Sequence, residues 1–177
     1  MIESSYWKAD ILKHRKKLKQ VGKPKKWSEK LQVNFEKEII ITFFMIRKLL
    51  ESHKLSSKSK KYKTSIYRAP VKVKKVHNLN YWDIDSIYDR ENEEKCKKSI
   101  NFICNQFIHG GATYAYRGKD RKWEGIYTCS DFERDKYVYK IPLEEIRNIF
   151  KIVGNDYPTS GSWIYSEEKG DYVITTN

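Results

Sequence analysis

Three polar side chains follow one another at four-residue steps near the middle of the chain. Asn101, Asn105 and His109 precede the pair Gly110-Gly111. At about 100° per residue, four-residue steps place these side chains along one side of a helix. Glycine closes helix C-termini, so His109 falls in the last turn, where the helix dipole favours a protonated imidazole. A histidine in that position can exchange a proton near neutral pH.

A second periodic pattern predicts the helix that carries these residues, over 93–109. Its apolar side chains recur at three- and four-residue steps and form one face, which we expect to be core. Lys98 falls on the polar side, between the asparagines and the histidine in projection. The members of the apolar face are Cys96, Ile100, Ile103 and Phe107.

The run Cys104-Asn105-Gln106-Phe107-Ile108-His109-Gly110 resembles the signature of the HEPN superfamily. Its metal-independent ribonucleases carry Arg, a polar residue that is often Asn, three further residues and then His. Asn105, His109 and Gly110 match this signature, whereas Cys104 occupies the arginine position. The resemblance implies a helical bundle, a site composed across a homodimer, and activity like that of toxin and phage-defence effectors.

The reaction implied by this resemblance is transfer of an RNA chain onto its own 2′-hydroxyl. His109 would then be the general acid or base, and Asn105 would orient the phosphate or the imidazole. A cation must stabilise the negative charge that develops on the phosphate. Arg47, on a neighbouring helix, or Lys98 would supply the cation that Cys104 does not.

A basic segment without any acidic residue covers positions 54–78. Such a segment repels itself and resists burial, so we expect a long loop or a partly ordered arm. Tyrosines interleave with its lysines, a mixture that can meet phosphates and stack on unpaired bases. An ordinary solvated loop is the alternative. The residues that we predict to contact nucleic acid are Lys60, Lys61, Tyr62, Lys63, Arg68 and Lys98.

The overall charge also favours an anionic partner. The formal net charge is +13 and the isoelectric point is near 9.5, so we expect nucleic acid ahead of membrane, and RNA ahead of DNA. An acidic protein is the other candidate partner. The leading functional hypothesis is an RNA-binding protein with metal-independent endoribonuclease activity, and the alternative is a non-catalytic nucleic-acid-binding or protein-interaction module.

Cofactors, metals and membranes find no support in the sequence. The three cysteines lack CxxC spacing, and no phosphate-cradling glycine loop occurs. We expect reduced cysteines in a cytoplasmic protein, because no secretory apolar segment follows Met1. The most apolar run, 39–46, is far shorter than the roughly 20 residues that span a bilayer.

The predicted fold is α+β, with a helical N-terminal half followed by a β-meander, one helix and a C-terminal β-hairpin. Residues 1–111 form the helical region with the basic loop 54–78, and residues 112–177 form a β-rich region packed on it, together one cooperative domain. A helix over 28–51 is expected to be the central core element, with Ser28 as its N-cap. A short strand is expected over 71–74.

Packing between the two main helices is the most specific structural expectation. The apolar stripe of the helix over 28–51 and that of the helix over 93–109 both need cover. We therefore expect contact between Ile39, Phe43 and Ile46 on one side and Ile100, Ile103 and Phe107 on the other.

Overall fold

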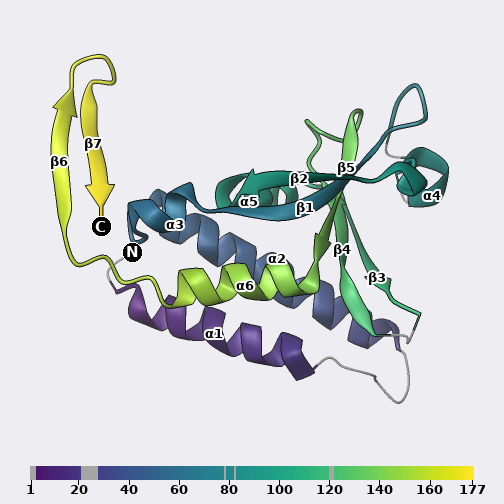
Figure 1. Cartoon of the computed structure of the whole chain (residues 1–177), viewed down its shortest axis with the longest axis horizontal. Helices are drawn as coiled ribbons and strands as arrows, with labels where there is room; N and C mark the ends of the chain where they lie inside the picture. Colours follow the sequence, from purple (N-terminus) through teal and green to yellow (C-terminus); the bar gives the residue numbers. More distant parts are fainter. Residues whose placement is uncertain (1–2, 21–27, 78, 82, 120–121) are drawn as a thin grey trace.

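The computed structural model describes residues 3–20, 28–77, 79–81, 83–119 and 122–177. It has the α+β fold predicted from the sequence, with a helical N-terminal half and a C-terminal β-hairpin (Figure 1). The helices are α1 (Ser5–Gln20), α2 (Glu29–Glu51), α3 (Ser57–Lys61), α4 (Ile84–Ile87), the 3-10 helix η1 (Arg90–Asn92), α5 (Ile100–Ile108) and α6 (Leu143–Gly154).

The strands form an antiparallel five-stranded sheet in the order β2-β1-β5-β4-β3, and the last two strands pair as a hairpin. Strand β1 therefore lies inside the sheet, between β2 and β5. Strands from residues 1–111 and 112–177 thus share one sheet. The strands are β1 (Lys63–Pro70), β2 (Glu94–Ser99), β3 (Ala112–Arg117), β4 (Trp123–Cys129), β5 (Tyr137–Pro142), β6 (Gly161–Ser166) and β7 (Asp171–Thr176).

Helix α2 begins and ends where its sequence signals place it. The Ser28 hydroxyl accepts a hydrogen bond from the Leu31 amide at 3.2 Å, as an N-cap does. Phe43 is fully buried, and its ring stacks on Phe107 of α5 with the centroids 4.5 Å apart. The predicted packing of α2 against α5 is therefore confirmed. Helices α2, α5 and α6 lie against one face of the sheet, and α1 packs on α6 and α2, so that the main core lies between these helices and the sheet.

The segment 93–109 is a strand followed by a helix, so the prediction of one continuous helix was wrong. Ser99 ends β2, and its hydroxyl accepts a hydrogen bond from the Phe102 amide at 3.2 Å as the N-cap of α5. Cys96 packs against the main core from β2. The apolar spacing from Cys96 to Ile100 suits a strand that leads into a helix as well as it suits a helix, which is why the pattern misled.

More than half of the described part of the basic segment, residues 54–77, is regular structure, so the prediction of a loop was also wrong. It contains α3 and the interior strand β1. Side chains alternate between the two faces of the strand, so Thr64 and Ile66 point toward the helices and are buried, while their neighbours are more exposed. The Thr64 hydroxyl donates a hydrogen bond to Glu145 of α6. The strand predicted over 71–74 reduces to one bridge between Val71 and Tyr88.

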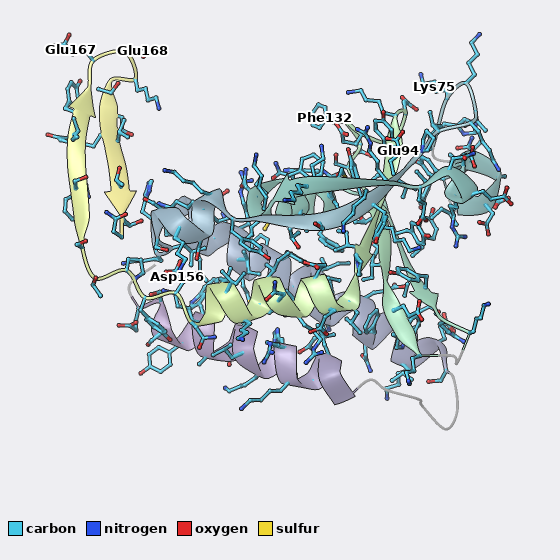
Figure 2. The ribbon with its side chains drawn as sticks, viewed as in Figure 1. Lys75, Glu94, Phe132, Asp156, Glu167 and Glu168 are labelled. Carbon is cyan, nitrogen blue, oxygen red and sulfur yellow. The ribbon has the colours of Figure 1, made fainter. Side chains whose placement is uncertain are left out.

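The second half of the chain follows the prediction. Strands β3, β4 and β5 form the meander, and α6 follows Pro142 with its apolar side chains in the core. The hairpin β6–β7 stands away from the rest of the molecule (Figure 1). Figure 2 shows Glu167 and Glu168 at its turn and Asp156 near its base. The three cysteines form no disulfide.

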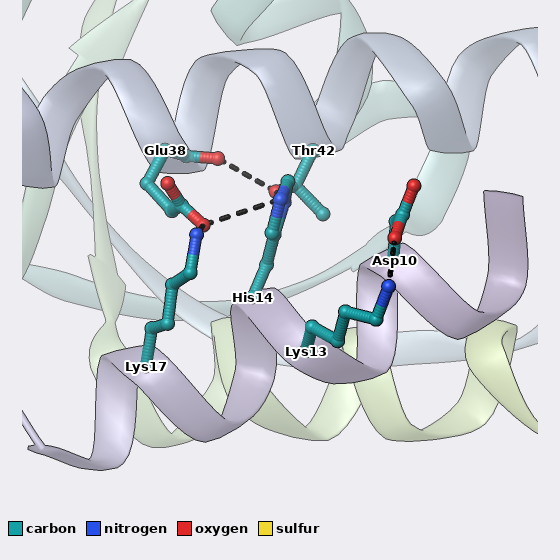
Figure 3. Close-up of polar contacts among 6 residues, drawn as sticks. All are labelled: Asp10, Lys13, His14, Lys17, Glu38 and Thr42. Carbon is teal, nitrogen blue, oxygen red and sulfur yellow. Dashed lines mark hydrogen bonds and ion pairs between the residues drawn. The ribbon is translucent and has the colours of Figure 1, made fainter.

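A polar network holds α1 on α2 (Figure 3). His14 Nδ1 lies 2.6 Å from the Thr42 hydroxyl, and His14 Nε2 lies 3.2 Å from a carboxylate oxygen of Glu38. Lys17 Nζ donates to the same Glu38 oxygen at 2.9 Å. On the exposed side of α1, Lys13 pairs with Asp10 at 2.8 Å.

Candidate nucleic-acid interface

The five-stranded sheet has a face directed away from α1, α2, α5 and α6, which we call the outer face. Side chains alternate between the two faces along each strand. In β1, Ile66 belongs to the main core, whereas Ala69 belongs to a second, smaller core on the outer face. The segment 71–93, which includes α4 and η1, contributes Ile87 and Tyr88 to that second core and so covers part of the outer face.

The strand register places one row of basic and aromatic residues across the outer face. Lys95 lies opposite Tyr67, Tyr67 opposite Lys140, Lys140 opposite Tyr127, and Tyr127 opposite Tyr114. Directly opposed residues in antiparallel strands point to the same face. The row therefore crosses all five strands, from the β2 edge to the β3 edge.

Lys140 lies at the centre of this row. Its Nζ is 5.8 Å from the ring centroid of Tyr67, 5.2 Å from that of Tyr116 and 5.7 Å from that of Tyr127. It also donates a hydrogen bond to Glu93 Oε2 at 2.8 Å. Burial is the largest influence and by itself would lower the pKa of Lys140, but the hydrogen bond to Glu93 and the electrostatic effects of Tyr127 and Glu93 together outweigh burial, and the pKa is raised. Lys140 therefore stays an ammonium ion among aromatic rings.

Tyr116 and Tyr127 of the outer face stay neutral. Burial raises the pKa of Tyr116, and burial together with a hydrogen bond to Glu93 raises the pKa of Tyr127. The rings of Tyr116 and Tyr127 lie 5.1 Å apart. Tyr127 is almost fully buried beneath the Arg90 guanidinium, 4.6 Å from its ring centroid. Tyr116 is only half-buried.

The β1–β2 end of the outer face is its open part. Lys63, Lys95 and Lys97 are exposed there, and Tyr67 is half-buried between them. Ser65 lies opposite Lys97 and separates Tyr67 from Lys63 along β1. Ammonium groups around a half-exposed aromatic ring can bind phosphate oxygens while the ring stacks on a base.

The row ends at a cavity of about 520 Å³ between β3–β4 and the segment 71–93. Tyr88 and Tyr114 form aromatic walls, and Arg134 and Asp131, 3.3 Å apart, lie among the lining residues. The Tyr114 hydroxyl is buried and has no hydrogen-bond partner within the described residues. The Tyr114 hydroxyl can therefore hydrogen-bond a polar atom of a planar ligand, and the aromatic walls can pack against the faces of that ligand.

Side chains alternate between the two faces of the sheet, so the residues predicted to contact nucleic acid lie on different faces. Lys63 is on the outer face, whereas Arg68 is on the helix side, where it bonds Glu94 at 2.7 Å. Lys98 is also on the helix side, with its Nζ 4.3 Å from the Phe102 ring centroid. These three cations do not form one surface.

The remaining predicted contacts lie on or beside α3. Lys60 Nζ donates to the Thr176 hydroxyl at 3.1 Å, and burial lowers the pKa of Lys60. The Tyr62 hydroxyl accepts a hydrogen bond from Asn148 of α6 at 2.9 Å. Lys61 is exposed. Lys60 and Tyr62 thus have structural partners, which the expected loop would not have provided.

Two of the three predicted catalytic residues are in direct contact. Arg47 Nη1 of α2 donates to Asn105 Oδ1 of α5 at 2.5 Å and to Asn101 Oδ1 at 2.7 Å. Arg47 Nε donates to Glu51 at 2.7 Å, so a carboxylate already neutralises the guanidinium. A neighbouring helix thus supplies a cation beside Asn105, as the sequence suggested.

His109 is the C-cap of α5 and is exposed. Its amide donates to the Asn105 carbonyl at 3.0 Å, and its own carbonyl accepts a hydrogen bond from the Asp131 amide at 3.0 Å. Cys104, the neighbour of Asn105 on α5, is fully buried, and burial raises the pKa of its thiol. Cys104 therefore supplies neither a charge nor a nucleophile to this surface.

Sequence reasoning missed most of the outer-face row. Lys95 and Lys97 were assigned to a helix, and Lys140 and Tyr127 received no functional role. The usable signal was the alternation of Lys95, Cys96 and Lys97, which is typical of a strand with one buried face. The row itself depends on pairing between strands far apart in the sequence.

Comparison with known proteins adds no relationship to this geometry. No three His, Cys, Asp or Glu side chains gather as metal ligands in the described part of the chain, and none of its described helices is long and apolar enough to cross a bilayer. The HEPN resemblance implies a helical bundle, whereas α5 packs between α2 and a sheet. No family model, curated protein or solved structure matches the chain.

Proposed function

We propose that this protein binds single-stranded nucleic acid, RNA ahead of DNA, on the outer face of its sheet. The observation that carries the proposal is the row in which Lys95, Tyr67 and Lys140 lie side by side on three adjacent strands. Antiparallel sheets that stack unpaired bases on exposed aromatic residues are a common mode of RNA recognition. We place this activity in the cytoplasm, where the three unpaired cysteines would stay reduced.

Each group in the row has a distinct part in binding. Lys63, Lys95 and Lys97 would contact phosphates. Neutralising these phosphates would release the counterions bound to the nucleic acid. Tyr67 would stack on one base, and Lys140 keeps its charge directly beside that ring. An unstacked base further along the nucleic acid would enter the cavity lined by Tyr114. The preference for RNA rests on the resemblance at residues 104–110.

The charge part of the proposal is tested with two adjacent lysines of β2. Lys97→Gln removes a cation from the outer face, and Lys98→Gln removes one from the helix side. Lys97→Gln should weaken binding of a single-stranded oligonucleotide and reduce the slope of log K against log salt by about 0.7. Lys98→Gln is the matched control and should leave the slope unchanged. Equal effects of the two variants would reject the outer face as the binding surface.

The stacking part is tested at Tyr67. Tyr67→Ala should cost about 1–3 kcal/mol of binding free energy, the value of one base stacked on an aromatic ring. Tyr67→Phe keeps the ring and should bind nearly as well as the natural protein. Fluorescence anisotropy with single-stranded RNA, single-stranded DNA and duplex gives the preference directly. Tighter binding to duplex, or no loss in Tyr67→Ala, would contradict the proposal.

RNA cleavage is a second candidate function, favoured by the 2.5 Å contact between Arg47 and Asn105. In this reaction His109 transfers the proton and Arg47, released from Glu51, stabilises the phosphate. His109→Ala should abolish cleavage and keep RNA binding, and cleavage should persist in EDTA. His53→Ala replaces another exposed histidine and is the control. Cleavage that survives in His109→Ala would reject this site.

A protein-binding role is the outcome if nucleic acid fails entirely. Should neither RNA nor DNA bind at low salt, the exposed lysines of the outer face would instead serve an acidic protein partner. The same Lys97→Gln and Lys98→Gln pair would then distinguish the two faces in binding to that partner.

A further inference from the structure

The hairpin β6–β7 presents an unusual amount of unpaired surface. Within the described residues, β6 and β7 pair only with each other. Its base is fastened by Thr176, whose hydroxyl donates to the Leu55 carbonyl and accepts from Lys60. The turn at Glu167 and Glu168 lies at the end away from the body (Figure 2). A two-stranded hairpin in water is marginally stable by itself, so this one needs cover.

One face of the hairpin is aromatic. Trp163 lies opposite Ile174, and Tyr165 lies opposite Tyr172, so the four side chains share a face. Trp163 is 63% exposed, Tyr165 54% and Tyr172 58%. The rings of Tyr165 and Tyr172 meet edge to face, 5.3 Å apart. A contiguous exposed aromatic face of this kind is typical of a protein interaction site.

The charges of the hairpin are distributed unevenly along its length. Its charged side chains are Glu167, Glu168, Lys169 and Asp171, all at or beside the turn, and they sum to −2 in a chain whose net charge is +13. The base is basic. A hollow of about 370 Å³ beside it is lined by Lys8, His53, Lys54 and Trp163. The acidic turn of the hairpin and Lys54 of the body beside its base are complementary when two such hairpins run antiparallel.

We propose that two copies of this chain associate through their β6–β7 hairpins, packed with aromatic face on aromatic face about a two-fold axis perpendicular to the strands. The axis makes the two hairpins antiparallel, so the turn of each enters the hollow at the base of the other. Glu167 and Glu168 then face Lys54 of the partner copy. The interface uses the same surface on both copies and closes as a dimer.

Charge also decides against nucleic acid as the occupant of this face. Trp163, Tyr165 and Tyr172 could stack on bases, but phosphates that follow the hairpin toward its turn would meet Glu167 and Glu168. The outer face of the sheet offers the same aromatic chemistry among lysines. A basic protein surface is the better match for the hairpin, and a second copy provides one at the required end.

The test measures self-association of the full chain by sedimentation velocity over a wide range of protein concentration. The natural protein should show a concentration-dependent dimer. Tyr165→Ser with Tyr172→Ser removes two rings from the aromatic face and should raise the dimer dissociation constant at least about 100-fold. Ile164→Ser with Val173→Ser changes a directly opposed pair on the opposite face, 67% and 41% exposed, and should have little effect. Unchanged far-ultraviolet circular dichroism confirms that each variant is folded.

A charge exchange tests the antiparallel arrangement itself. Glu168→Lys and Lys54→Glu should each weaken the homodimer about tenfold, because each places like charges at both ends of the interface. An equimolar mixture of the two variants should dimerise again, since every tip then meets a base of opposite charge. Restoration in the mixture requires that the contact is between copies.

Three results would overturn the proposal. The natural protein could remain monomeric at every concentration, the opposite-face variant could lose the dimer as completely as the aromatic-face variant, or the charge mixture could fail to restore it. If the aromatic-face variant loses RNA binding while the mass stays monomeric, the hairpin is a nucleic-acid site. If only Tyr67→Ala loses RNA binding, that result concerns the proposed binding surface on the outer face and is independent of the proposed dimer.

Discussion

His14 connects α1 to α2 through both nitrogens of its ring. The Thr42 hydroxyl donates its only proton to the Glu38 carbonyl at 2.6 Å, so Nδ1 of His14 must be the donor in the contact with Thr42. Burial lowers the pKa of His14 below its ordinary value of 6.5, and the Glu38 carboxylate offsets burial only in part. Among the other nearby charges, Lys17 and Lys13 oppose protonation and Asp10 favours it.

This lowered pKa makes stability depend on pH. As the pH falls through about 6.5, the unfolded chain takes up a proton at His14 before the folded chain does, so the free energy of unfolding decreases. The stabilising contribution is complete above that pH and is lost below it. His14→Gln removes the titration, so its urea-unfolding free energy should fall less than that of the natural protein between about pH 7.5 and pH 5.5.

The matched control for this prediction is His53→Gln, which changes an exposed histidine. It should keep the pH dependence of the natural protein. If His14→Gln and His53→Gln respond to acid alike, the acid sensitivity comes from other groups and the role assigned to the α1–α2 network is wrong.

The sequence predicts a single site residue only where its charge alone indicates the role or where its contacts follow from the packing of predicted helices. Lys63 was predicted to meet nucleic acid and is on the open part of the outer face. Arg68, five residues later, is on the opposite face because an odd step along a strand changes sides. The contact between Arg47 and Asn105 follows from the predicted packing of their helices, although the pairing of Arg47 with Glu51 was not foreseen.

The contact between α2 and α5 can be tested with two adjacent phenylalanines. Phe43 is fully buried, stacked on Phe107 and edge-on to Phe150, whereas Phe44 is 47% exposed. Phe43→Ala should lower the free energy of unfolding by about 3–5 kcal/mol, because it removes a core ring and leaves a cavity. Phe44→Ala, which removes the same atoms from the surface, should change it by about 0.5 kcal/mol or less.

Chemical denaturation of both variants measures this difference. A loss below about 1 kcal/mol in Phe43→Ala would mean that the α2–α5 core can collapse around the missing ring, contrary to the packing described. A large loss in Phe44→Ala would place that side chain in an interface that forms in solution.

Elements with local signals were predicted well, and elements defined by distant pairing were not. Helix α2 has a capping serine and a long apolar stripe, both visible in the sequence. Strand β1 has no such signal, because Lys63, Arg68 and the lysines just before the strand resemble a solvated loop, and its partners β2 and β5 lie far along the chain. The strand β2 was absorbed into a helix because Ser99, the N-cap of α5, was not recognised as a boundary.

The molecule as a whole consists of a sheet, a layer of helices packed on it, and a hairpin that, within the described residues, adds no strand to that sheet and no residue to the core. Strands β1 and β5 have a paired neighbour on both sides, and one face of each contributes to the main core. The hairpin residues are absent from both core clusters of the described chain. Local opening of β6–β7 therefore breaks few contacts, whereas exposing the amides of β1 requires disruption of the sheet.

Amide hydrogen exchange separates these two kinds of strand. At low protein concentration, the amides of β6 and β7 should exchange by local opening, with free energies far below that of global unfolding, whereas those of β1 and β5 should exchange only near the global value. Slow exchange in β1 would also distinguish a sheet strand from the loop expected for residues 54–78. Mass spectrometry of peptides from the two regions measures both in one experiment.

Raising the protein concentration adds a second comparison within the same chain. Protection of β6 and β7 should increase as copies associate, because a dimer in which the aromatic faces are covered stabilises the hairpin by mass action. Protection of β1 and β5 should stay the same, since neither strand takes part in the interface. Protection of β6 and β7 that already equals that of β1 in dilute protein would show that the hairpin is stable by itself, and the physical reason given for its association would then fail.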